Sequence, residues 1–193
     1  MTRIKYLGCF FLLAISFSSG ICQELDKNKN VVSVDYTFYQ GDKFDGGDAL
    51  ARGVVIGYSR YFMERIYGDI SYGLMNFEGK NSKWYLDPEE MSFINMRTFT
   101  LGLGYDLIQN GRFTLSGEMA YLYQSNEGLL MILNTGTRII RETGVTTDSA
   151  LRTKLKASVA IDKNLNFITS YSRGFRFVKY SSNWLSLGLS YSF

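Results

Sequence analysis

Apolar and polar residues alternate in eight segments of the chain, most clearly in the last one. From Trp184 to Phe193 the odd positions are Leu, Leu, Leu, Tyr and Phe, and the even positions after Trp184 are Ser, Gly, Ser and Ser. Successive side chains of a strand point to opposite faces, so such a segment forms a ribbon with one apolar face. The sequence therefore predicts eight strands, at residues 32–39, 52–59, 66–75, 98–107, 113–124, 151–162, 165–172 and 184–193.

Short and long connections alternate between these strands. The short ones are 60–65, 108–112 with its Asn110-Gly111 turn signal, and 163–164. The long ones are 40–51, 76–97, 125–150 and 173–183. Outer-membrane barrels join their strands in this way, by short periplasmic turns and long external loops. The pattern predicts an all-β fold, an eight-stranded antiparallel up-and-down transmembrane β-barrel over residues 31–193.

Aromatic residues on the apolar faces separate into two groups by expected height. If the first strand rises from the periplasm, the lower group is Tyr58, Tyr105, Phe113, Tyr191 and Phe193, and the upper group is Phe38, Tyr72, Tyr121, Tyr123 and Tyr171. Amphipathic rings prefer the two membrane–water interfaces. A soluble core, the alternative, gives no reason to sort aromatic residues by height.

The other faces are small or polar and include three acids and three bases: Asp35, Asp69, Glu118, Arg152, Lys154 and Lys156. A cation facing lipid at mid-depth costs roughly 2–4 kcal/mol, so these side chains are expected inside the barrel. Glu118 lies on the strand next to that of Lys154 and Lys156, at a similar depth, and we expect it to pair with one of these two lysines.

An eight-stranded barrel is barely wide enough for its own side chains. Inward glycines leave space that large inward residues are expected to fill, namely Tyr39, Tyr67, Met75, Leu122 and Trp184. The sequence favours a plugged or very narrow lumen over a conducting pore.

Residues 1–22 have the order of a secretory signal peptide. Arg3 and Lys5 precede an apolar run from Tyr6 to Phe17, and small residues follow it. Residues 23–30 then form a short lead into the barrel. Lipidation at Cys22 is an alternative, although Ile21 is larger than the residue such sites prefer.

Composition excludes several classes of chemistry. Both cysteines lie in the predicted leader, so nothing supports a disulfide scaffold or a thiolate metal site. Without Arg3 and Lys5 of the leader, nineteen basic residues stand against eighteen acidic ones, and this balance gives no support to a nucleic-acid partner. The chain has no histidine to serve in a Ser/His/Asp triad. We therefore expect no enzyme activity, cofactor or metal. Asp87, Glu89 and Glu90 are interpreted as a solvated loop rather than a weak calcium site.

Two external loops contain candidate contact residues. The connection at 125–150 has the apolar run Leu129, Leu130, Met131 and Ile132, on a projecting hairpin or on a short helix capped by Ser125. The connection at 173–183 offers Arg173, Arg176 and Lys179, which suit lipopolysaccharide phosphates. Packing between loops and a solvated basic loop are the alternatives.

The segments Gly53–Tyr58, Leu101–Tyr105 and Leu187–Phe193 resemble the small outer-membrane barrels typified by OmpX-like and OmpA-like proteins. The alternation ending at Tyr191 and Phe193 looks like the signal that the barrel-assembly machinery recognises. The resemblance implies an outer-membrane location among outer-membrane lipids. We expect a non-enzymatic structural or surface-interaction role with an unidentified surface partner. A narrow pore or carrier for small solutes is the alternative, and an enzyme acting on envelope lipids is disfavoured.

Overall fold

The fold is given by a computed structural model. It describes residues 29–44, 47–78, 96–134, 139–175 and 181–193. Within these ranges only the backbone is described for 42–44, 47–49, 77–78, 128–134, 139–143 and 181. The predicted leader and lead, up to residue 28, lie outside the described residues and remain predictions.

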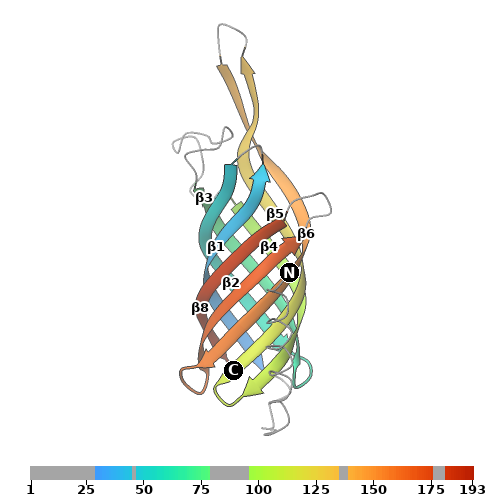
Figure 1. Cartoon of the computed structure of the whole chain (residues 1–193), viewed down its shortest axis with the longest axis vertical. Helices are drawn as coiled ribbons and strands as arrows, with labels where there is room; N and C mark the ends of the chain where they lie inside the picture. The colour runs from blue at the N-terminus through green and yellow to red at the C-terminus, as the bar shows by residue number, and fades with distance from the viewer. Residues whose placement is uncertain (1–28, 45–46, 79–95, 135–138, 176–180) are drawn as a thin grey trace, which may run out of the picture.

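Eight antiparallel strands form one closed barrel, in which each strand pairs with the next along the chain and β8 pairs with β1 (Figure 1). The strands are β1 (Asn30–Phe44), β2 (Gly47–Tyr61), β3 (Ile66–Glu78), β4 (Met96–Asn110), β5 (Phe113–Asn134), β6 (Ile139–Ala160), β7 (Leu165–Phe175) and β8 (Ser181–Ser192). All eight predicted strands are present, including 165–172, where the alternation is weakest.

Alternation along each strand separates two surfaces. On β4, Leu101 and Leu103 are 57% and 64% exposed, whereas Thr100 and Asp106, on the other face of the same strand, are each 1% exposed. All ten aromatic residues of the two predicted girdles face outward and are exposed. The exterior is therefore apolar and the interior polar, the reverse of a water-soluble protein.

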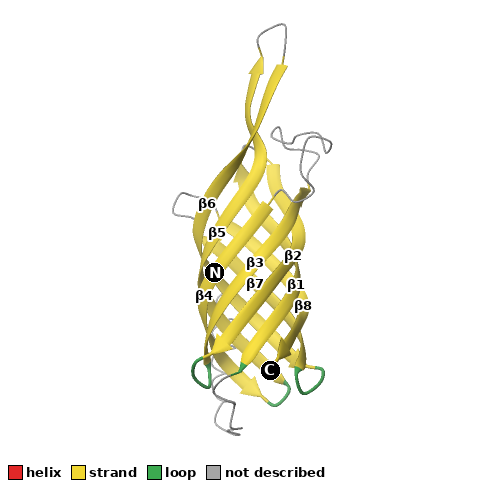
Figure 2. Ribbon diagram, turned by 180° about the vertical axis from the view of Figure 1, so that it is seen from behind, coloured by secondary structure: helices red, strands yellow, loops and turns green. Residues whose placement is uncertain are grey.

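Three short turns lie at one end of the barrel, at residues 62–65, 111–112 and 161–164 (Figure 2). Gly111 has a φ of 52°, a left-handed conformation that glycine adopts without steric cost. At this end Asn30 and Phe193 exchange backbone hydrogen bonds of 3.0 and 2.9 Å and close the ring. In outer-membrane barrels the end with short turns is periplasmic.

The prediction of a long loop at 40–51 was wrong, because β1 continues to Phe44 and β2 begins at Gly47. The helix alternative at 125–150 was also wrong, because this segment is a β-hairpin. Both segments continue strands beyond the apolar band, where no lipid is present to require a period of two.

The β5–β6 hairpin projects beyond the rest of the barrel (Figure 1). In the described residues, pairing of β5 with β4 ends at Asn126, and pairing of β6 with β7 ends at Leu151. The β5–β6 ladder continues to the pair Asn134 and Ile139, with an irregularity between Leu129 and Met131. Eight residues of β5 past Asn126 correspond to roughly 26 Å of extended strand.

In the described part of the chain, no helix is long and apolar enough to cross a membrane.

Candidate functional site

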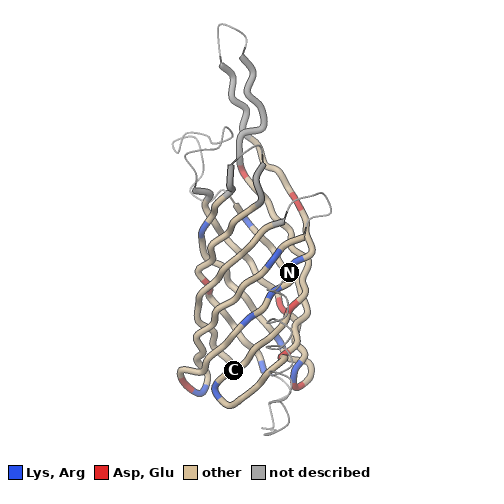
Figure 3. The backbone as a smooth tube through the Cα atoms, viewed as in Figure 1, with Lys and Arg blue, Asp and Glu red and all other residues tan. Residues whose placement is uncertain are grey.

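All six predicted interior charges lie at inward positions, on four strands. Asp35 is on β1, Asp69 on β3 and Glu118 on β5, and the three bases lie at alternate positions of β6. Asp69, Glu118 and Arg152 are each at most 6% exposed, and the other three are partly buried. The backbone tube shows acidic and basic positions at mid-height (Figure 3).

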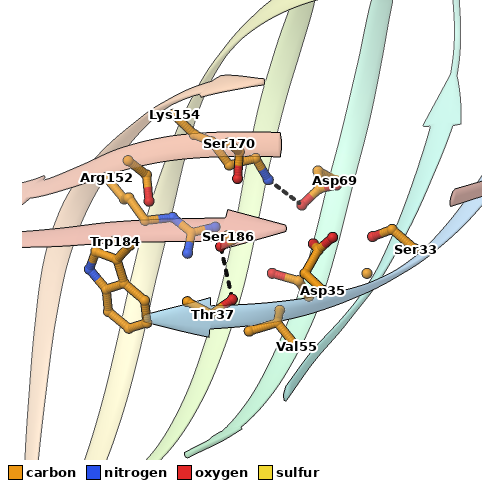
Figure 4. A pocket seen from close by; sticks show the side chains of 13 residues that line it. Ser33, Asp35, Thr37, Val55, Asp69, Arg152, Lys154, Ser170, Trp184 and Ser186 are labelled. Carbon is orange, nitrogen blue, oxygen red and sulfur yellow. Dashed lines mark hydrogen bonds and ion pairs between the residues drawn. The ribbon is translucent and has the colours of Figure 1, made fainter. Parts of the chain in front are cut away.

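Lys154 connects two of the acids. Its Nζ lies 2.8 Å from Glu118 Oε2, which is the pairing expected from the sequence, and 3.8 Å from Asp69 Oδ2 (Figure 4). Arg152 Nη2 lies 3.8 Å from Glu118 Oε1, and the Ser59 hydroxyl donates a 2.6 Å hydrogen bond to Asp69 Oδ1. Because Asp69, Glu118, Arg152 and Lys154 each have a partner of opposite sign, the cost of removing these four charges from water is partly offset.

Asp35 and Lys156 have different surroundings. Lys156 Nζ lies 4.5 Å from the centre of the Tyr67 ring. Asp35 Oδ1 is buried without a hydrogen-bond partner, close to where a Cβ on Gly188 would lie. Among the described residues, neither side chain makes an ion pair.

An apolar plug fills the lumen on the external side of these charges. Its members are Tyr39, Ala51, Met75, Met96, Leu122, Ala150 and Trp184. The rings of Tyr39 and Trp184 meet edge to face at 4.7 Å, and Arg152 lies 5.8 Å from the Trp184 ring. All five predicted fillers, including Tyr67, are buried. Alternation on β4 also identifies Met96, although its strand was expected to begin two residues later.

A second, polar plug lies near the periplasmic end and was not predicted. Asp106 is 1% exposed and accepts hydrogen bonds from the Ser116 hydroxyl at 2.7 Å, the Gln109 amide at 2.7 Å and the Tyr61 hydroxyl at 3.0 Å. Burial lowers the pKa of the Lys29 ammonium, and the charge of Asp106 opposes this shift.

A register shift between Asp106 and Ile108 explains why alternation missed Gln109 as a member of this plug. The extra residue in a bulge changes the face that later side chains occupy. Gln109 stands on the outward side by simple alternation, but in the structure it reaches Asp106. The available signal was Asp106 itself, an acidic residue on the inward face of the predicted strand 98–107.

A small polar cavity lies between the two plugs (Figure 4). Its volume is about 20 Å³, and its lining is rich in serine and threonine, with Asp35, Asp69 and Lys154 among the charged members. A cavity this small holds about one water molecule. In the described residues no group of three acidic, histidine or cysteine side chains is placed to hold a metal ion.

The predicted external contact residues are only partly described. Leu129, Leu130, Met131 and Ile132 lie in the projecting part of β5, where the backbone alone is described. Arg173 is exposed on β7, and its guanidinium lies 5.5 Å from the Phe175 ring. Arg176, Lys179, Asp87, Glu89 and Glu90 lie outside the described residues. Tyr191 and Phe193 stack at 6.4 Å on the exterior of the periplasmic end.

The closed ring, the apolar exterior and the paired interior charges define the class. This chain is an eight-stranded transmembrane β-barrel of the outer-membrane type, and the predicted resemblance to small outer-membrane barrels is confirmed at the level of the fold.

Comparisons with known proteins agree with this class. The attachment invasion locus protein Ail of Yersinia pestis is 13% identical and covers 87% of this chain and 100% of its own, with a TM-score of 0.60. Neisserial surface protein A is 13% identical and covers 85% of this chain and 97% of its own, with a TM-score of 0.61. The N-terminal barrel domain of Pseudomonas aeruginosa OprF is 14% identical and covers 86% of this chain and 99% of its own, with a TM-score of 0.55.

A second Ail structure contains the heparin analogue sucrose octasulfate, and it matches at 14% identity over 87% of this chain and 100% of its own, with a TM-score of 0.60. The sequence matches no protein-family model and no curated protein sequence. At these identities the likeness establishes the fold alone.

Proposed function

We propose that this chain is a non-enzymatic outer-membrane protein that acts at the cell surface through its β5–β6 hairpin. The observation that carries the proposal is the continuation of the β5–β6 ladder to Asn134 and Ile139, past the last described pairing of either strand with another neighbour. A ribbon outside the ring contributes nothing to closing the barrel. Its retention as ordered strand fits a role in contact with something outside the membrane.

The proposed partners are anionic. Ail, which shares the fold, has been crystallised with a heparin analogue, and this chain has Arg173 at the external end of β7. Together with Arg176 and Lys179, this arginine would pair with sulfate groups or with lipopolysaccharide phosphates. Tyr191 and Phe193 are proposed as the signal for the barrel-assembly machinery.

The lumen supports an interaction role better than the pore alternative. Buried side chains occupy it above and below the charged residues, and the cavity between them is no larger than about 20 Å³. Hydrated ions and solutes need a continuous wider path, so the resting barrel is expected to be closed.

Shortening the hairpin tests the proposal. Replacing residues 129–143 with Asn-Gly joins the paired residues Gly128 and Gly144 and leaves the ring unchanged. Cells displaying this variant are expected to lose adhesion to cultured cell monolayers, while the variant still folds and reaches the outer membrane. Lys163→Asn, in a turn at the opposite end, is the matched control. Unchanged adhesion of the shortened variant would contradict the proposal.

A further inference from the structure

Two exposed arginines at the short-turn end of the barrel have no acidic neighbour along the chain or across a ladder. They are Arg60, near the end of β2, and Arg112, in the β4–β5 turn. Among the described residues, no ion pair or side-chain hydrogen bond involves either of them. Figure 3 shows several basic positions at this end. The other described cations here each have an acid close by, in the combinations Lys29 and Asp106, Arg65 and Glu64, and Lys163 and Asp162.

Arg60 marks the periplasmic edge of the apolar band. The outward positions of β2 run from Arg52 through Val54, Ile56 and Tyr58 to Arg60. Eight residues of strand are roughly 26 Å long, and at a tilt of about 40° they span roughly 20 Å of membrane. The apolar band of such barrels is about 25 Å tall, so a long arginine side chain at its edge reaches the headgroup layer.

The surface beside Arg60 is fixed in place. Its neighbours across the ladders are Asn30 on β1 and Gly68 on β3. The Phe62 ring is 58% exposed and lies over Gly68, where a Cβ would meet it at 3.0 Å. The Phe62 amide donates a 3.0 Å hydrogen bond to the Ile66 carbonyl oxygen and holds the turn closed. An aromatic ring and an unpaired guanidinium therefore flank Gly68 on the outer surface of the barrel.

The β4–β5 turn repeats this combination. The Ala160 amide donates a 2.7 Å hydrogen bond to the Arg112 carbonyl oxygen, so the turn is fastened to β6. The next residue, Phe113, is 38% exposed on the outer surface and pairs with Val159. Aromatic rings prefer the membrane–water interface, and arginine binds phosphate through two parallel hydrogen bonds. Each site therefore combines a ring suited to the interface with a cation suited to one phosphate group.

We propose that Arg60 and Arg112 bind the phosphate groups of anionic phospholipids in the periplasmic leaflet. Anionic headgroups attract basic residues at a membrane surface, and the apolar residues further along the strands accommodate the acyl chains. Peptidoglycan also carries negative charge, but it would leave the Phe62 and Phe113 rings in water. The inference is independent of the proposed surface role, because it concerns the opposite end of the barrel.

Lipid quenching beside each arginine tests the proposal. Phe62→Trp and Phe113→Trp place a reporter next to Arg60 and Arg112 in the purified protein. Each reporter protein is folded into mixed vesicles of phosphatidylcholine and phosphatidylglycerol, in which one of the two lipids has brominated acyl chains. The quenching of the two native tryptophans, measured in the parent protein, is subtracted. Each reporter is expected to show about fivefold stronger association with phosphatidylglycerol, the effect of one cation near an anionic surface.

Substitution of the arginines then assigns the preference. Arg60→Gln and Arg112→Gln are each expected to remove it at the neighbouring reporter, whereas Arg60→Lys and Arg112→Lys keep most of it because the charge remains. Arg97 is an exposed, outward-facing arginine at the external end of β4. Arg97→Gln is therefore the matched control and is expected to leave both reporters unchanged.

Heat-dependent gel mobility checks folding, and Ile66→Trp and Val159→Trp serve as reporters if the first two do not fold. Equal quenching by the two lipids would overturn the proposal, as would a preference that survives both glutamine substitutions or falls equally in Arg97→Gln. If quenching is equal and Arg60→Gln/Arg112→Gln sediments less with purified peptidoglycan than the wild type, the arginines serve the cell wall instead. Adhesion through the β5–β6 hairpin is measured separately, so the failure of either proposal is distinguishable.

Discussion

At the scale of the residue, the interior charges show what alternation can and cannot predict. Six ionisable residues at inward positions, and the pairing of Glu118 with Lys154, follow from strand period and neighbouring register. The contact of Gln109 with Asp106 does not follow, because the bulge after Asp106 changes the face of Gln109. Whether Lys154 also reaches Asp69 depends on side-chain conformation across the lumen, which a linear pattern does not contain.

Removing Glu118 leaves two buried cations without their shared acid. Glu118→Ala is therefore expected to lower the free energy of unfolding by about 3–5 kcal/mol. Urea titration of the protein in lipid vesicles, followed by tryptophan fluorescence, measures the change. Asp162→Asn in an exposed turn is the control and is expected to be neutral. A Glu118→Ala variant as stable as the wild type would show that the ion pairs do not hold the interior together.

Tyr67 packs against the glycine on its neighbouring strand. A Cβ on Gly104 would overlap the Tyr67 ring, so Gly104→Ala must displace that buried ring and is expected to destabilise the barrel by about 1–3 kcal/mol. Gly117→Ala is the matched control, because its Cβ would meet Leu107 at an ordinary 3.6 Å. Equal stability of the two variants in the same urea titration would contradict the packing described for Tyr67.

At the scale of the element, the strands were predictable where they face lipid and less so beyond it. Lipid on one face and a packed lumen on the other impose a period of two on residues such as Leu185 to Tyr191. Past the apolar band, 41–44, 47–51 and 125–134 are strands that lack this constraint, so their sequence resembles that of a loop. The β5–β6 hairpin was therefore expected only as one of two alternatives.

The β4–β5 turn depends on its glycine. An L side chain in the left-handed conformation of Gly111 costs roughly 1–2 kcal/mol, so Gly111→Val is expected to destabilise the hairpin by about that amount and to slow refolding into vesicles. Gly111→Asn should retain most of the stability, because asparagine tolerates positive φ. If valine and asparagine behave alike, the turn does not need this backbone conformation.

At the scale of the whole molecule, the central feature is the apolar exterior. Leu103 is 64% exposed and lies between Gly68 on β3 and Met119 on β5, in the apolar band between the two girdles. Leu103→Arg is expected to cost about 2–4 kcal/mol in a bilayer, because a charge at that depth faces hydrocarbon. Leu103→Ala, which adds no charge, is the control. The yield of protein folded into vesicles measures the effect. If Leu103→Arg folds with the same yield as the wild type, this surface faces water and not lipid.

The backbone contact between Asn30 and Phe193 makes assembly a global event. Asn30 lies on the first strand and Phe193 directly follows the last one, so the seam joins the two strands most distant in sequence. Until they meet, two rows of amides and carbonyls lack partners, and hydrocarbon cannot supply any. A half-built ring is therefore strongly disfavoured inside the bilayer. Spontaneous insertion should be slow, and a catalyst that shields the open edges during threading should accelerate it without changing the final structure.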